Sequence, residues 1–158
     1  MEVEVKLRFT TPCLGNERHA QRDLMLRSGS GHVALLQSWW RACLAFAAQA
    51  LNQHQRDIES IQADPEVDGN VTIHKRYWND REFKEHECFA AGELVTARFF
   101  LPNEVPIDDF RCLLETAGKY AGISPYGYRQ NFGRFVVVSV TPIRRVSAAA
   151  KPKTTGAG

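Results

Sequence analysis

The spacing of hydrophobic residues changes several times along this chain, and the order of those changes restricts the folds that it can adopt. Positions 3, 5, 7 and 9 hold Val, Val, Leu and Phe, with charged residues between them. This period of two predicts a strand with one buried face, which ends before Pro12 and Gly15. From position 36 to 53 the apolar residues recur every three or four positions, which predicts a helix that can continue to Ile61.

The rest of the chain continues this alternation. Runs at 71–78, 93–101 and 134–140 predict three more strands, and a stripe over 107–121 predicts a second helix. Polar residues at 16–31 and 79–86 predict loops. The order β-α-β-β-α-β predicts a ferredoxin-like α+β domain, with an antiparallel four-stranded sheet and two helices on one face. We expect a single domain over residues 1–145 and a flexible basic tail over 146–158.

The segment before the last strand carries the strongest indication of function. Residues 122–135 include three glycines, four aromatic residues and two arginines but no carboxylate. Glycine lets a backbone approach another molecule closely, arginine binds phosphates, and aromatic rings stack on bases. We expect this segment to present these groups outward and to bind single-stranded RNA or DNA without catalysis. The expected binding residues are Tyr126, Gly127, Tyr128, Arg129, Phe132, Gly133, Arg134, Arg144 and Arg145.

The charge distribution supports an anionic partner, although the net charge is only +2. Glu115 is the last acidic residue, and seven Lys or Arg residues follow it. Such asymmetry indicates an anionic partner or a basic tail. Arg144, Arg145 and the lysines of the tail would add salt-dependent attraction to a phosphate backbone.

Three segments of the chain are similar to parts of a known family. The first strand ends in Thr11-Pro12, and Gly15 follows. Residues 31–41 precede and begin the first predicted helix. Residues 127–135 form a glycine-containing tract before the last strand. In this order they resemble the RAMP proteins, the RNA-binding superfamily of CRISPR-associated complexes. The last tract also resembles short uncharacterised phage proteins. The resemblance implies a compact ferredoxin-like domain whose loop holds nucleic acid, RNA in preference to DNA, and an origin in a phage.

Two alternatives to non-catalytic binding remain open. His74, Lys75 and Tyr77 supply the base and cation that a metal-independent endoribonuclease needs, although His74 and Lys75 would lie on opposite faces of a strand. Trp39 and Trp40 cannot both face one core. One of them would then contact a protein partner or a second copy of the chain, as in a viral inhibitor of a host defence complex.

Other classes of function lack their signatures. The four cysteines are far apart, without the close pairs of a structural zinc site, and we expect reduced thiols in a cytoplasmic protein, in the host cytosol if it is viral. No P-loop, metalloprotease or nucleophile-elbow motif occurs, so we expect neither a cofactor nor a metal. No apolar run is long enough to span a membrane, and the alternating N-terminus is unlike a signal peptide.

Overall fold

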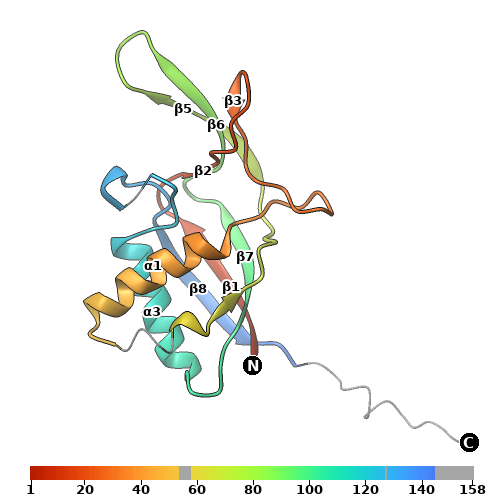
Figure 1. The fold of residues 1–158 in the computed structure, drawn as a ribbon, viewed down its shortest axis with the longest axis vertical. Helices are drawn as coiled ribbons and strands as arrows, with labels where there is room; N and C mark the ends of the chain where they lie inside the picture. The colour runs from red at the N-terminus through yellow and green to blue at the C-terminus, as the bar shows by residue number, and fades with distance from the viewer. Residues whose placement is uncertain (54–57, 127, 145–158) are drawn as a thin grey trace, which may run out of the picture.

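The largest element of the fold is a four-stranded antiparallel sheet covered on one face by two helices (Figure 1). The structure, a computed structural model, describes residues 1–53, 58–126 and 128–144. The spatial order of the strands is β4-β7-β1-β8, and each neighbouring pair is antiparallel. The expected α+β class, with helices packed on an antiparallel sheet, is confirmed. The strands of this main sheet are β1 (Glu2–Phe9), β4 (Gln62–Ala63), β7 (Leu94–Phe100) and β8 (Phe135–Pro142), and the helices are α1 (Gln37–Ala50) and α3 (Ile107–Tyr120).

The hydrophobic core lies between this sheet and the two helices. The apolar side chains at positions 3, 5, 7 and 9 of β1 are fully buried, so the period of two places one face of that strand inward. Trp40 of α1 is also fully buried, and its ring centroid lies 4.8 Å from that of Phe99 and 6.2 Å from that of Phe135. Edge-to-face contacts of this kind join α1 to strands β7 and β8.

Helix α3 packs directly on the backbone of β8 at Gly118. A Cβ atom at Gly118 would overlap the carbonyl oxygen of Phe135 and lie 2.6 Å from its ring. The absence of a side chain therefore sets the distance between helix and strand. Gly122, with a φ of 78°, follows the helix and donates its N–H to the carbonyl of Ala117. This positive φ turns the chain out of the helix and into the glycine-rich segment.

A second, smaller sheet corrects two of our expectations. Strand β5 (Val71–Tyr77) pairs with β6 (Phe83–Phe89) in an antiparallel hairpin and does not join the main sheet. Residues 79–86, predicted as a loop, contain the first half of β6. The short strands β2 (Cys13–Leu14) and β3 (Arg22–Asp23) also pair with β6, so the predicted loop 16–31 contains a strand.

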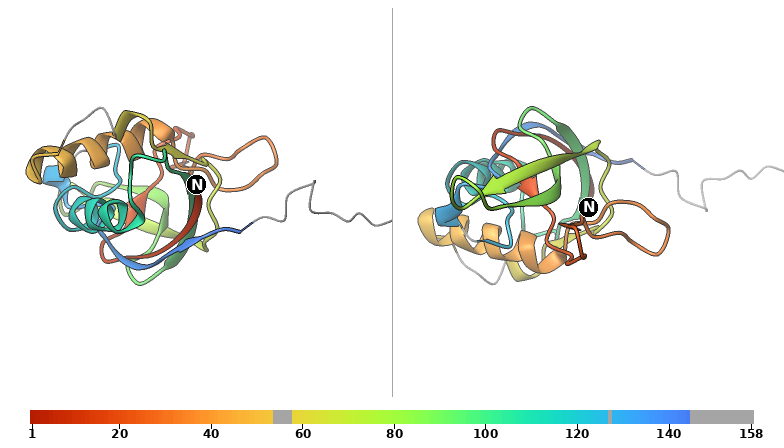
Figure 2. Two further views of the ribbon diagram at one scale, coloured as in Figure 1. Left: turned by 90° about the horizontal axis from the view of Figure 1, so that it is seen from below. Right: turned by 90° about the horizontal axis from the view of Figure 1, so that it is seen from above.

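The hairpin forms because the sequence alternates on both of its strands and turns tightly between them. In β6 the buried His86 and Cys88 alternate with the more exposed Glu85 and Glu87. The side chain of Asn79 accepts the backbone N–H groups at positions 81 and 82, at 2.8 and 2.7 Å, which is a turn that asparagine favours. The hairpin projects beyond one end of the main sheet (Figure 1), and in the view from above it lies in front of the rest of the domain (Figure 2).

Some predictions concern segments that the structure does not describe. The continuation of the first helix to Ile61 includes residues 54–57, and the predicted tail 146–158 lies beyond Arg144. Helix α1 ends at Ala50, and Asn52 follows with a φ of 56°. Within the described ranges, no helix is long and apolar enough to cross a membrane.

The contact at Gly118 makes a prediction about stability. We expect Gly118→Ala to lower the free energy of unfolding by about 1–2 kcal/mol, because the overlap with a backbone oxygen outweighs the roughly 1 kcal/mol of helix propensity that alanine adds. Thermal unfolding followed by circular dichroism measures the change. The matched control is Gly29→Ala, where a Cβ would meet nothing within 4 Å. Equal melting temperatures for wild type and Gly118→Ala would contradict the account.

Candidate nucleic-acid interface

The glycine-rich segment 122–134 is a loop whose two ends are joined by backbone hydrogen bonds. The N–H of Ile123 donates to the carbonyl of Gly133 at 2.8 Å, and the N–H of Gly133 donates to the carbonyl of Pro12 at 2.7 Å. Gly133 has a φ of 71°, and a Cβ there would overlap the carbonyl of Ile123. Gly133 thus closes the neck of the loop, a role that requires glycine whether or not a ligand binds.

Two rings of this loop do not point outward as expected but pack on the hairpin β5–β6. The ring of Tyr126 lies 5.7 Å from that of His86, and the guanidinium carbon of Arg76 lies 4.8 Å from the centre of the Tyr126 ring. The ring of Phe132 lies 6.0 Å from that of His74 and 6.2 Å from that of Tyr126. Both rings are half-buried. They fasten the loop to the hairpin, so their faces are not fully available to a base.

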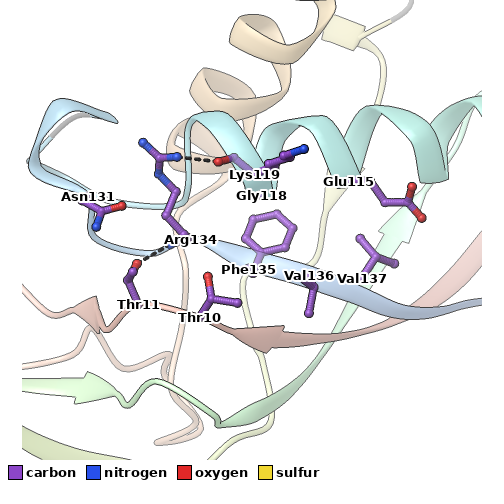
Figure 3. Close-up of a pocket in the computed structure, with 10 residues that line it drawn as sticks. All are labelled: Thr10, Thr11, Glu115, Gly118, Lys119, Asn131, Arg134, Phe135, Val136 and Val137. Atoms are coloured by element: carbon purple, nitrogen blue, oxygen red, sulfur yellow. Dashed lines mark hydrogen bonds between the residues drawn. The ribbon is translucent and has the colours of Figure 1, made fainter.

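The two arginines of the loop have different surroundings. Arg129 is exposed in a short 3-10 helix, η1 (Tyr128–Gln130). Arg134 is half-buried; its backbone N–H donates to the hydroxyl of Thr11 at 2.9 Å, and its guanidinium donates to the carbonyl of Lys119. Figure 3 shows this side chain extending from the start of β8 to the end of α3. Arg134 therefore satisfies a carbonyl at the end of the helix.

The other predicted binding residues are not gathered at the loop. Arg144 is exposed and follows the last residue of β8, whereas the loop precedes the first residue of that strand. Gly127, Arg145 and the side chain of Tyr128 lie outside the part of the chain that is described. Their binding roles stay predictions.

Behind Tyr126 lies a buried polar network that the sequence analysis missed. His86 is fully buried, and its Nδ1 lies 2.7 Å from the carbonyl oxygen of Gly15. Because a carbonyl only accepts, Nδ1 carries the hydrogen and Nε2 accepts from Nε of Arg76, at 3.3 Å. Nearby, the buried carboxylate of Asp23 forms an ion pair with Lys84 at 3.0 Å. The alternation over 83–89 was the signal that could have placed Lys84 and His86 on one face.

The three residues of the ribonuclease alternative do not form one cluster. His74 faces Phe132 of the loop. On the opposite face of β5, the ammonium of Lys75 lies 4.9 Å from the centre of the Phe83 ring, and the ring of Tyr77 lies 5.3 Å from that of Phe83. Lys75 and Tyr77 are thus turned away from His74, as the alternation of a strand requires.

Exposed aromatic rings occur at the tip of the hairpin. Tyr77 is 59% exposed, Trp78 is 55% exposed and Phe83 is 43% exposed. Aromatic side chains this exposed on a projecting ribbon are typical of a binding surface. We call these three residues the tip rings.

The two tryptophans of α1 have different environments. Trp40 belongs to the core. Trp39 is half-buried and packs against the core, where it lines a hollow of about 150 Å³ with Phe46 and Gly122. A protein partner at Trp39 stays a prediction.

Comparison with known proteins gives a likeness of fold. No protein-family model and no curated protein matches this chain. A chain of a Type IV-B CRISPR complex is similar to it, with a TM-score of 0.58 and 10% sequence identity, over 96% of this chain and 95% of that chain. At this identity the likeness concerns the fold alone. The expected link with CRISPR-associated proteins is therefore supported as a shared fold, and membership of the RAMP superfamily stays a prediction.

The surroundings of His74 make a prediction about pH. Partial burial, and then the nearby guanidinium of Arg76, lower the pKa of His74. The folded protein therefore binds fewer protons than the unfolded chain between this lowered pKa and the ordinary value of about 6.5. The contribution of His74 to stability is thus fully retained above about pH 6.5 and falls as the pH drops toward the folded pKa.

We expect the Cε1–H resonance of His74 in an NMR titration to have a midpoint below about 6.5 in the folded protein and near that value in urea. On acidification the melting temperature of wild type should fall more than that of His74→Gln. A folded midpoint at or above the unfolded one would show that the predicted environment is wrong.

Proposed function

We propose that this chain binds single-stranded nucleic acid, RNA in preference to DNA, without catalysing a reaction. The observation that supports this most is the surface at which the glycine-rich loop contacts the hairpin, because both segments carry basic residues. His74 and Arg76 come from β5, and Arg129 comes from the loop. We call this surface the loop–hairpin junction.

The electrostatics of the junction favour an anion. Burial raises the pKa of Tyr126, and its ionisation is also influenced by two nearby cations, Arg76 and Arg18, and by one nearby anion, Asp23. The carboxylates of β3 and β6 form ion pairs with other cations, and those at positions 85 and 87 lie on the face of the hairpin opposite to Arg76. These pairs are Asp23 with Lys84, Glu85 with Arg22 and Glu87 with Arg27. A phosphate backbone would supply the missing negative charge.

The tip rings are the reason why we propose that the protein prefers single strands. Unpaired bases expose their faces, and a base that stacks on an aromatic side chain gains about 1–3 kcal/mol. In this proposal the strand passes around the tip of the hairpin, because Tyr77 and Phe83 lie on the face opposite to Arg76. Tyr77, Trp78 and Phe83 stack on bases, whereas Tyr126 and Phe132 hold the loop in place. Arg144 and Arg145 add weaker, salt-dependent attraction away from the junction.

The fold is compatible with this proposal. We propose that the main sheet is a ferredoxin-like arrangement in which β4 takes the position of the second strand and the hairpin is inserted after it. The similar chain belongs to a CRISPR complex, which supports association with nucleic acid or with other subunits. A cytoplasmic location and a phage origin stay predictions that accompany this function.

The tip rings provide the first test. We expect Tyr77→Ala to weaken binding to a fluorescein-labelled single-stranded RNA by about tenfold in an anisotropy titration, because one stacked base loses its platform. The matched control is Tyr120→Ala. Tyr120 is a similarly exposed ring, 51% exposed, with Lys119 5.2 Å from its centre, but it belongs to α3 and not to the hairpin. The proposal would be contradicted if wild type bound duplex and single-stranded RNA with equal affinity. It would also be contradicted if Tyr77→Ala and Tyr120→Ala lost affinity equally.

One observation favours a second candidate, a metal-independent endoribonuclease. The pKa of His74 is lowered, so this side chain is neutral and able to accept a proton near neutral pH. Arg76, two residues further on the same face, would stabilise the phosphorane in place of Lys75. Under the binding proposal we expect structured RNA incubated with the protein in EDTA to remain intact. Cleavage that His74→Gln abolishes would establish the enzyme instead.

A further inference from the structure

Arg76 is the most unusual charged residue of the loop–hairpin junction. It is half-buried, and no carboxylate of the described residues forms an ion pair with it within 4.0 Å. Its contacts are Nε2 of His86, which accepts a hydrogen bond, and Tyr126, whose ring it covers and with whose side chain it also forms a hydrogen bond. A partly desolvated guanidinium without an acid partner is costly to the protein alone, and an anion that reaches it offsets that cost.

The contacts of Arg76 also orient it. The single N–H on Nε is directed to His86, while the guanidinium lies over Tyr126. The remaining N–H groups of an arginine lie on its two Nη atoms, which is the edge that forms paired hydrogen bonds with phosphate oxygens. His86 cannot easily move, because it is fully buried and donates from Nδ1 to the carbonyl of Gly15. The buried histidine therefore fixes the direction of an arginine that is closer to the solvent.

The nearest acid does not interfere with this arrangement. Asp23 lies beside His86, with an oxygen 3.8 Å from Nδ1, but it is paired with Lys84, which is the cross-strand partner of Arg76. Lys84 thus pairs with Asp23, the one carboxylate that is buried among the described residues, and the positive charge of Arg76 remains for a ligand.

We propose that Arg76 is a binding site for one phosphodiester group of a nucleic-acid strand, and that the buried His86 is its positioning residue. This inference rests on the proposed function and names a contact within it. It also predicts that a change at Arg76 alters both the affinity and the number of phosphates contacted. A change at His86 alters the affinity alone, because only Arg76 carries the charge.

The test is a set of RNA titrations at several salt concentrations with Arg76→Ala, Arg76→Lys, His86→Leu and His86→Gln. We expect Arg76→Ala to weaken binding about tenfold and to reduce the slope of log affinity against log salt by about 0.7, the value for one phosphate on a single strand. Arg76→Lys should keep the slope of wild type but lose affinity, because lysine cannot form the paired contact.

The histidine variants separate positioning from charge. His86→Leu should weaken binding with no change of salt slope, and His86→Gln should restore part of the affinity, because its amide oxygen can again accept from Arg76. Thermal melts identify any loss of folding at this buried site, and the two Arg76 variants carry the test if His86→Leu does not fold. Arg98→Ala, at an exposed position on β7, is the control that should bind like wild type.

The outcomes distinguish this inference from the proposed function. If wild type binds RNA but Arg76→Ala has the same affinity and the same salt slope, the inference is wrong and the proposed function stands. If wild type binds neither RNA nor DNA, both are wrong. The Arg76 Nε–H resonance is also followed in an NMR titration with millimolar inorganic phosphate. If phosphate shifts this resonance as fully as the oligonucleotide does, the site binds free phosphate instead.

Discussion

The packing of Tyr126 and Phe132 against the hairpin is the interaction on which the proposed site depends. A two-stranded hairpin is only marginally stable by itself, and a loop rich in glycine loses much conformational entropy when it is ordered. Each segment therefore gains a fixed position from contact with the other. The same contact places Arg76 between the buried His86 and the ring of Tyr126.

One short segment after β1 connects this junction to the core. The carbonyl of Pro12 accepts the N–H of Gly133 at the neck of the loop, and the next two residues, Cys13 and Leu14, pair with β6 of the hairpin. Loop and hairpin are thus held by adjacent residues of a single extended segment. Because β1 is a central strand of the main sheet, the position of the junction follows from the packing of the core.

The sequence predicted the elements with strong periodicity and failed where pairing depends on distant partners. The alternation in β1 and the apolar stripes of α1 and α3 predicted their position because each is a local pattern that buries one face. Local pattern does not reveal which strand pairs with which, so β5 was assigned to the wrong sheet. The two-residue strand β4 is too short to have a pattern of its own.

The candidate site was predicted only in part for a related reason. The glycines and arginines of the loop indicated a site. The orientation of its rings, however, depends on the hairpin that packs against them, and the first half of β6 was predicted as a loop. His86 and Arg76 were therefore not predicted as residues of the site. Arg134 resembles a ligand-binding residue in the sequence, whereas its contact with the end of α3 depends on the tertiary fold.

The most direct test of the central claim is a ¹H–¹⁵N NMR titration of the folded protein with a short single-stranded RNA. The account predicts that the largest shifts fall on the hairpin around residues 74–78 and on the loop around 129–133, with little change in α1 or at Tyr120. Shifts confined to the outer face of the main sheet or to the helices would contradict it.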